Sequence, residues 1–323
     1  MLVTTLAAGL SACAWTPIGA VPRDSEALPS SVSILDVEWT DAARERRVPA
    51  RLYWPVHNIA TSPVPLVVFS HGIGGTRRGY SYLGQHLAAQ GWACLHVQHV
   101  GSDSAVWHGN PFGIMTRLRS AAHDDEALHR VHDLRFALDR LLAQDGAPGC
   151  DVDRRRIVVA GHSYGANTAM LGVGASVKRG GQLVVPRDPR FTAAVLMSAP
   201  PFHGERDLAA ILGPIQVPTL HITTTEDVIR IPGFYSPVAD RLDIFEAMGG
   251  RPKQLVVFNG GSHSVFTDWG GNRGHALQLK TSAKFLAHAF LREVFDGVGE
   301  EIADWRLHWA NVVARASGPF ISI

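Results

Sequence analysis

The sequence predicts one α/β domain with a mostly parallel, eight-stranded sheet and helices on both faces. Short apolar runs such as Leu66-Val67-Val68-Phe69 are typical of strands that are buried on both sides. These runs alternate with longer segments, such as residues 124–142, in which apolar residues recur at helical spacing. No repeat, low-complexity stretch or interdomain linker interrupts residues 32–323. This alternation favours a mostly parallel sheet covered by helices.

The expected elements follow these runs along the chain. The first two strands alternate apolar and polar residues, so we expect an antiparallel pair with one solvated face. The expected strands are residues 33–40, 48–54, 65–70, 92–100, 157–160, 193–197, 218–223 and 255–258. The expected helices are residues 80–90, 124–142, 163–177, 277–295 and 300–313.

Composition sets broad limits on function. The chain has 323 residues, of which 46% are hydrophobic, and this suits a sizeable buried core. A formal net charge of +1 gives no indication of a nucleic-acid partner. The chain carries 16 histidines, so histidine content alone cannot identify a catalytic one.

Residues 1–31 read as a targeting segment and tether separate from the domain. The apolar run at residues 2–10 is too short to span a bilayer. The Leu10-Ser11-Ala12-Cys13 stretch that ends it resembles a bacterial lipoprotein signal. We therefore expect export, with the protein periplasmic or anchored to a membrane through lipid on Cys13. Simple secretory cleavage after Ala14 fits almost as well, and a cytoplasmic protein with a disordered N-terminus is the alternative.

The strongest chemical signal is Gly161-His162-Ser163-Tyr164-Gly165. It directly follows the apolar strand at residues 157–160 and precedes a segment rich in Ala and Gly. A sharp strand-to-helix turn strains the serine backbone, exposes its hydroxyl and requires small flanking residues. We therefore predict that Ser163 is a nucleophile; the alternative is an ordinary N-cap serine.

A serine hydroxyl needs a neighbouring base, and in this arrangement the base follows the last strand. After residues 255–258 comes a Gly-rich loop that contains His263. Its glycines permit the tight turn that would bring the imidazole to Ser163. The competitors His275 and His288 lie farther along, in the expected closing helix. We predict His263 as the general base.

The acid that orients the base is expected after the preceding strand. The strand at residues 218–223 leads into Thr224-Thr225-Glu226-Asp227, so two carboxylates compete for this role. We prefer Asp227, because its shorter side chain is easier to hold rigidly. Glu226 would then be a solvated neighbour or an anchor for the loop.

Two backbone amides are expected to form the oxyanion hole. One is the N–H of Tyr164, directly after the nucleophile. The other belongs to the Gly-rich loop at residues 70–75, where Ile73 is the best candidate donor. We interpret His71 as a structural residue that is hydrogen-bonded beneath this loop.

Three further features admit more than one interpretation. His123, His129 and His132 lie near several aspartates but match no zinc-ligand spacing, so we expect no metal and no cofactor. The stretch at residues 101–123 lacks a clear period and is either a wall over the site or a surface loop. Several large apolar side chains could line a pocket or simply pack in the core. They are Trp107, Phe112, Met115, Phe202 and Phe234.

These motifs resemble a known superfamily. The similarity lies in the segment Phe69-Ser70-His71-Gly72-Ile73-Gly74-Gly75, in the Ser163 motif, and in the positions of the acid Asp227 and the base His263. Together they resemble the dienelactone-hydrolase-like branch of the α/β-hydrolases. That branch includes proteins similar to platelet-activating factor acetylhydrolase. The histidine loop at residues 259–264 also resembles that of bacterial cutinases and polyester hydrolases. The resemblance implies an α/β-hydrolase fold and hydrolysis of a small-molecule ester without a cofactor.

The chain departs from these relatives at two points. True dienelactone hydrolases use a cysteine where this chain has Ser163, so their substrate is not carried over. In the acetylhydrolases the acid follows the strand after the nucleophile helix, where residues 196–200 hold no carboxylate. Short acyl esters are therefore the expected substrates. The alternatives are a polyester hydrolase, a hydrolase of amides or thioesters, and a non-catalytic binding protein.

Overall fold

The computed structural model describes residues 31–56, 63–143, 151–179, 181–205, 207–231 and 234–321. Cys13, the expected site of a lipid anchor, lies outside these residues. Among the helices that are described, none is both long enough and apolar enough to cross a membrane.

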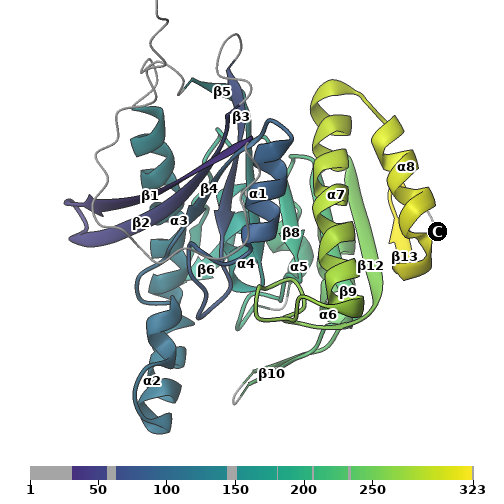
Figure 1. The fold of residues 1–323 in the computed structure, drawn as a ribbon. Coiled ribbons are helices and arrows are strands. Elements are labelled where there is room, and N and C mark those ends of the chain that lie inside the picture. Colours follow the sequence, from purple (N-terminus) through teal and green to yellow (C-terminus); the bar gives the residue numbers. More distant parts are fainter. Residues whose placement is uncertain are drawn as a thin grey trace, which may run out of the picture.

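A nine-stranded sheet forms the centre of the domain, in the order β1-β2-β4-β3-β5-β8-β9-β12-β13 (Figure 1). The strands from β4 to β12 in this order run parallel, while β1 and β2 at one edge and β13 at the other are antiparallel to their neighbours. The bounds of the strands are β1 Val32–Asp41, β2 Arg46–Pro55, β3 Val64–Ser70, β4 Ala93–Val97, β5 Val152–His162, β8 Ala193–Met197, β9 Thr219–Glu226, β12 Lys253–Ser262 and β13 Val313–Ser317.

The predicted parallel sheet is confirmed, but the predicted number of eight strands is wrong. The ninth strand is β13, which follows α8 (Glu300–Trp309) and a short 3-10 turn, where we expected helix up to residue 313. Its buried residues do not alternate with exposed ones, so no period of two marks it as a strand. It forms because its backbone pairs with the edge strand β12, which the local pattern does not encode.

Alternate residues of the central strands belong to two separate hydrophobic clusters. In β3, Leu66 and Val68 belong to one cluster, and Val67 and Phe69 to the other. This division follows from the side-chain period of two along a strand. It explains why the run is continuously apolar, because both faces of the sheet are covered.

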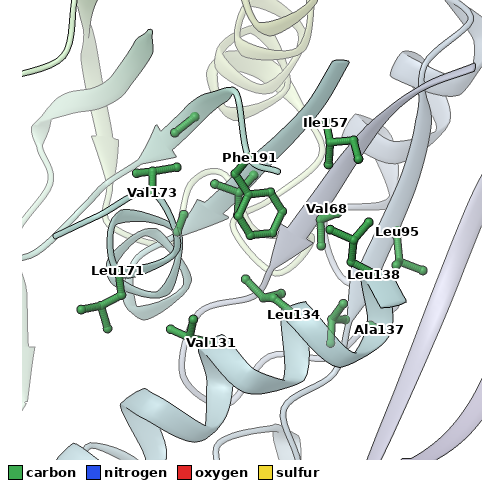
Figure 2. Packing of buried hydrophobic residues seen from close by; sticks show 14 of the residues in the cluster. Val68, Leu95, Val131, Leu134, Ala137, Leu138, Ile157, Leu171, Val173 and Phe191 are labelled. Atoms are coloured by element: carbon green, nitrogen blue, oxygen red, sulfur yellow. The ribbon is translucent and has the colours of Figure 1, made fainter. Parts of the chain in front are cut away.

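On the first face, α3 (Asp124–Leu142) and α4 (Tyr164–Gly172) pack against the sheet. Figure 2 shows Val131 and Leu134 of α3 directed toward Val68 and Phe191. On the opposite face lie α1 (Ser81–Ala89), α7 (Gly274–Asp296) and α8. The indole N–H of Trp305 in α8 donates to the Ser282 carbonyl of α7 over 2.9 Å, which fixes the outer helix to the inner one.

The remaining short elements lie outside the nine-stranded sheet. They are α2 (Pro111–Ala121), the 3-10 helix η1 (Ser104–Trp107), α5 (Leu208–Leu212), α6 (Ala239–Ala247), the hairpin of β6 (Val177–Arg179) and β7 (Gln182–Val184), and the hairpin of β10 (Ile229–Ile231) and β11 (Phe234–Ser236). Of these, α2 and the β10–β11 hairpin project beyond the carboxyl ends of the parallel strands (Figure 1), while Ile211 of α5 and Ile244 of α6 belong to the cluster on the first face. The stretch at residues 101–123, expected as a wall or a loop, thus forms η1 and α2. The Trp107 indole N–H donates to the Gly74 carbonyl over 3.0 Å, so η1 contacts the loop after β3.

We predict that the folded state loses stability as the pH falls from 7 toward 4. Burial lowers the pKa of His96, His162 and His221 to about 3 each. Between pH 6.5 and 3 the unfolded chain therefore binds protons that the folded chain excludes. Each histidine then removes roughly 1 kcal/mol of stability per pH unit in that window.

Urea unfolding at several pH values measures this loss. The His221→Gln variant cannot titrate at that position, so its free energy of unfolding should depend less steeply on pH than that of the wild type. Equal stability of the wild-type chain at pH 7 and pH 4.5 would contradict the prediction.

Candidate active site

Ser163 lies in a strained turn between β5 and α4. Its backbone has φ 55° and ψ −124°, a conformation that residues with a side chain rarely adopt. A Cβ on Gly161 would lie 2.2 Å from the Gly165 carbonyl oxygen, and a Cβ on Gly165 would lie 1.9 Å from the Ser70 carbonyl oxygen. Only glycine fits at both positions. The turn therefore places the Ser163 side chain at the carboxyl edge of the sheet, beside the end of β3.

The structure brings Ser163, His263 and Asp227 together from three loops. The imidazole Nε2 of His263 lies 2.8 Å from the Ser163 Oγ, and its Nδ1 lies 2.6 Å from the Asp227 Oδ1. A carboxylate only accepts hydrogen bonds, so Nδ1 carries the proton and donates it to Asp227. The Nε2 lone pair is then free to accept the hydroxyl hydrogen of Ser163.

Asp227 is fully buried and held from several sides. The Thr223 hydroxyl donates to its Oδ2 over 2.6 Å, and the Arg241 guanidinium lies 3.3 Å from its Oδ1. Burial alone raises the pKa of this carboxyl. The hydrogen bond and charge of His263, the charge of Arg241 and the Thr223 hydroxyl outweigh burial and bring the pKa well below its usual value. Asp227 is therefore ionised at neutral pH.

Glu226 and the competing histidines lie elsewhere. Glu226 is the exposed last residue of β9, so it does not share the buried position of its neighbour. The His275 Nε2 donates to the Asn259 carbonyl over 2.6 Å, and the His288 Nδ1 pairs with Glu301 over 2.9 Å. No group of His, Cys, Asp and Glu side chains in the described part of the chain could hold a metal ion.

The loop after β3 lies against Ser163. A Cβ on Gly72 would be 3.3 Å from the Ser163 Cβ, so the two backbones are in close contact. Within this loop, the Gly74 amide donates to the Ser102 carbonyl over 2.8 Å and the Gly75 amide to the Gly72 carbonyl over 3.0 Å. The amide of the half-buried Ile73 has no such acceptor among the described residues, and a substrate oxygen could take that place.

His71 lies beneath the loop, as we interpreted it from the sequence. Its Nδ1 donates to the Gly72 carbonyl over 2.7 Å, and its Nε2 accepts the backbone N–H of His99 over 3.1 Å. Burial holds its pKa well below the ordinary value, so the ring is neutral. Both ring nitrogens are used in supporting the loop.

A chain of hydrogen bonds connects the loop after β3 to the histidine loop. The Gly72 amide donates to the Tyr80 hydroxyl over 3.3 Å, and that hydroxyl donates to the His162 Nδ1 over 2.9 Å. The His162 Nε2 then donates to the His263 carbonyl over 2.9 Å. The direction follows because a carbonyl oxygen only accepts, which fixes the tautomer of His162. Sequence reasoning assigned no role to either Tyr80 or His162.

A small hollow of about 30 Å³ lies beside α4. Tyr164 and Asn167 of α4 line it together with Phe202, one of the side chains expected either to line a pocket or to pack in the core. The hollow lies against α4, which begins at Tyr164 directly after the candidate nucleophile. A space of this size accommodates a group about as large as a water molecule.

The chain is similar in sequence to a family of acetylhydrolases. The family described as platelet-activating factor acetylhydrolase, isoform II, matches residues 25–110. Platelet-activating factor acetylhydrolase from Bos taurus is 24% identical over 249 residues, which cover 67% of this chain and 51% of that protein. The protein of the same name from Cavia porcellus is 24% identical over 268 residues, covering 72% of this chain and 56% of the relative. The chain thus spans about half the length of the curated relatives that it matches.

Among solved structures, a ferulic acid esterase from Streptomyces cinnamoneus superposes with a TM-score of 0.58 and 22% identity, covering 85% of this chain and 92% of that one. This chain has the α/β-hydrolase fold, so the predicted fold is confirmed. In sequence it is similar to platelet-activating factor acetylhydrolase, as the resemblance in its motifs predicted. As is usual in this fold, the sheet presents its candidate nucleophile on the turn after a central strand.

We predict that Asp227→Asn slows the reaction of Ser163 with a fluorophosphonate probe by about 10³-fold or more, because the amide no longer holds the His263 proton on Nδ1. The matched control is Glu226→Gln, which removes the adjacent, exposed carboxylate and should leave the rate unchanged. The rate is measured from gel fluorescence over time. A slow Glu226→Gln variant beside a fast Asp227→Asn variant would reverse the assignment.

Proposed function

We propose that the chain is a serine hydrolase that cleaves carboxylic esters through an acyl-enzyme intermediate. The observation that carries this proposal is His263, whose two ring nitrogens lie within hydrogen-bond distance of Ser163 and Asp227. The names of the relatives, acetylhydrolase and ferulic acid esterase, both describe ester cleavage and support the same class. A protein that only binds a ligand has no need of all three groups at these distances.

Ester cleavage would proceed in two halves. In the first, His263 Nε2 takes the hydroxyl proton of Ser163 while the Oγ attacks the ester carbonyl carbon. The amides of Ile73 and Tyr164 stabilise the resulting oxyanion, and the imidazolium then gives its proton to the departing alcohol. In the second half, His263 takes a proton from a water molecule as its oxygen attacks the acyl carbon. The bond between that carbon and the Ser163 Oγ then breaks, the imidazolium returns the proton to Oγ, and the acid product leaves. Asp227 stays ionised and stabilises the imidazolium in each half.

The preferred acyl group in this proposal is short. The curated relatives are named for the removal of an acetyl group, which is a short acyl group, and this supports the preference.

Replacement of the nucleophile tests the reaction. Ser163→Ala should lower kcat for p-nitrophenyl acetate by about 10⁴-fold or more, because no other hydroxyl replaces the attacking oxygen. Ser264→Ala is the matched control: it removes a hydroxyl next to His263 that has no assigned part in the reaction, and it should keep near-wild-type turnover. Undiminished turnover by Ser163→Ala would refute the proposal.

A series of p-nitrophenyl esters tests acyl length. We expect kcat/KM to be highest for acetate and butyrate and to fall by about tenfold or more at octanoate, because a site shaped for a short acyl group must rearrange its packed side chains to take a longer one. An optimum at octanoate in the wild-type protein would contradict the preference for short chains.

A further inference from the structure

Arg130 of α3 is a fully buried arginine beneath the candidate oxyanion hole. Its Nε donates to the Thr168 hydroxyl over 2.9 Å, and one terminal nitrogen donates to the Ser102 hydroxyl over 2.8 Å. The other terminal nitrogen donates to the Ser70 hydroxyl over 3.1 Å and also to the His71 carbonyl. One planar side chain therefore connects the end of β3, helix α4 and the loop after β4.

The charge of Arg130 is unusual because no carboxylate pairs with it directly among the described residues. The nearest acidic link runs through Ser102, whose hydroxyl donates to Glu126 over 2.8 Å. By contrast Arg46, at the rim of the same network, pairs directly with both Glu126 and Asp133. Burial lowers the pKa of Arg130 to about 10, so the side chain is still charged at neutral pH. A buried charge without a direct partner costs stability, and such costs are typical of functional sites.

The contacts of Arg130 divide between the two segments that carry the predicted oxyanion donors. The carbonyl of His71 is two residues before Ile73 in the loop after β3. On the other side, the guanidinium carbon lies 4.5 Å from the centre of the Tyr164 ring, and Thr168 is one helical turn farther along α4. The segment with Ile73 and the segment with Tyr164 are thus held by the same rigid group.

We propose that Arg130 is a positioning residue that sets the separation of the Ile73 and Tyr164 amides so that both reach one oxyanion. This inference rests on the proposed ester hydrolysis and adds a determinant of its rate. The planar fork of arginine suits the task because it makes several hydrogen bonds in fixed directions. Lysine has the same charge but cannot connect the Thr168 hydroxyl, the Ser102 hydroxyl and the His71 carbonyl with one rigid geometry.

Arg130→Lys tests the proposal in the full chain. With p-nitrophenyl acetate, kcat per active site should fall by about 10- to 100-fold while KM changes by less than about twofold, because the oxyanion is stabilised only once it forms. Titration with a fluorophosphonate counts the active sites, so a loss of folded protein does not lower the measured kcat. Inhibition by a phenylboronic acid, which forms a tetrahedral adduct on serine, should weaken by a similar factor.

Two further variants keep the test decisive. Thr168→Val removes one anchor of Arg130 with little change of shape, and kcat should fall by about threefold to tenfold; this variant decides the matter if Arg130→Lys does not fold. Arg190→Lys is the control, because Arg190 pairs with Asp188 and Asp139 and contacts none of the predicted site residues. It should retain wild-type kcat.

The outcomes separate the inference from the proposed function. Wild-type kcat and boronate inhibition in folded Arg130→Lys, or in Thr168→Val when the first does not fold, would overturn the role of Arg130 alone. A wild-type protein that neither reacts with the fluorophosphonate nor hydrolyses the ester would overturn the proposed function, and the inference with it.

Discussion

The close approach of two backbones is the constraint on which the site depends. The turn after β5 passes so near the end of β3 that Gly165 has no room for a side chain beside the Ser70 carbonyl. The same approach brings Gly72 against Ser163, so the candidate nucleophile and the loop with Ile73 occupy one place. The strain at Ser163 is tolerated because the flanking strand and helix fix both ends of the turn.

Two contacts hold His263, one to its ring and one to its backbone. Asp227 fixes the ring through Nδ1, while His162 fixes the backbone through the His263 carbonyl. The second contact leads through Tyr80 to the Gly72 amide, so the histidine loop and the loop after β3 share a support. A displacement of either loop would therefore disturb the other, which favours one fixed arrangement of the site.

A buried arginine lies beside the orienting acid, and another lies beside the predicted oxyanion donors. Arg241 lies next to Asp227, and Arg130 lies beneath the Ile73 and Tyr164 segments. Each guanidinium holds its neighbouring groups in a fixed orientation. Buried ions do little for stability when compared with apolar residues of the same volume, so their presence here fits a site selected for geometry.

The sequence alone determined the features that depend on neighbouring residues. Continuous apolar runs predicted the parallel strands, because burial on both faces leaves no polar position. The glycines around Ser163 predicted the strained turn, and the Gly-rich loop predicted where His263 would stand. Tertiary structure decided what depends on distant segments. It buried Asp227 and exposed Glu226, added β13 to the sheet, and brought Arg130 and Arg241 to the site. None of these has a local signature, because a partner contributed by a remote element leaves no period or spacing in the chain.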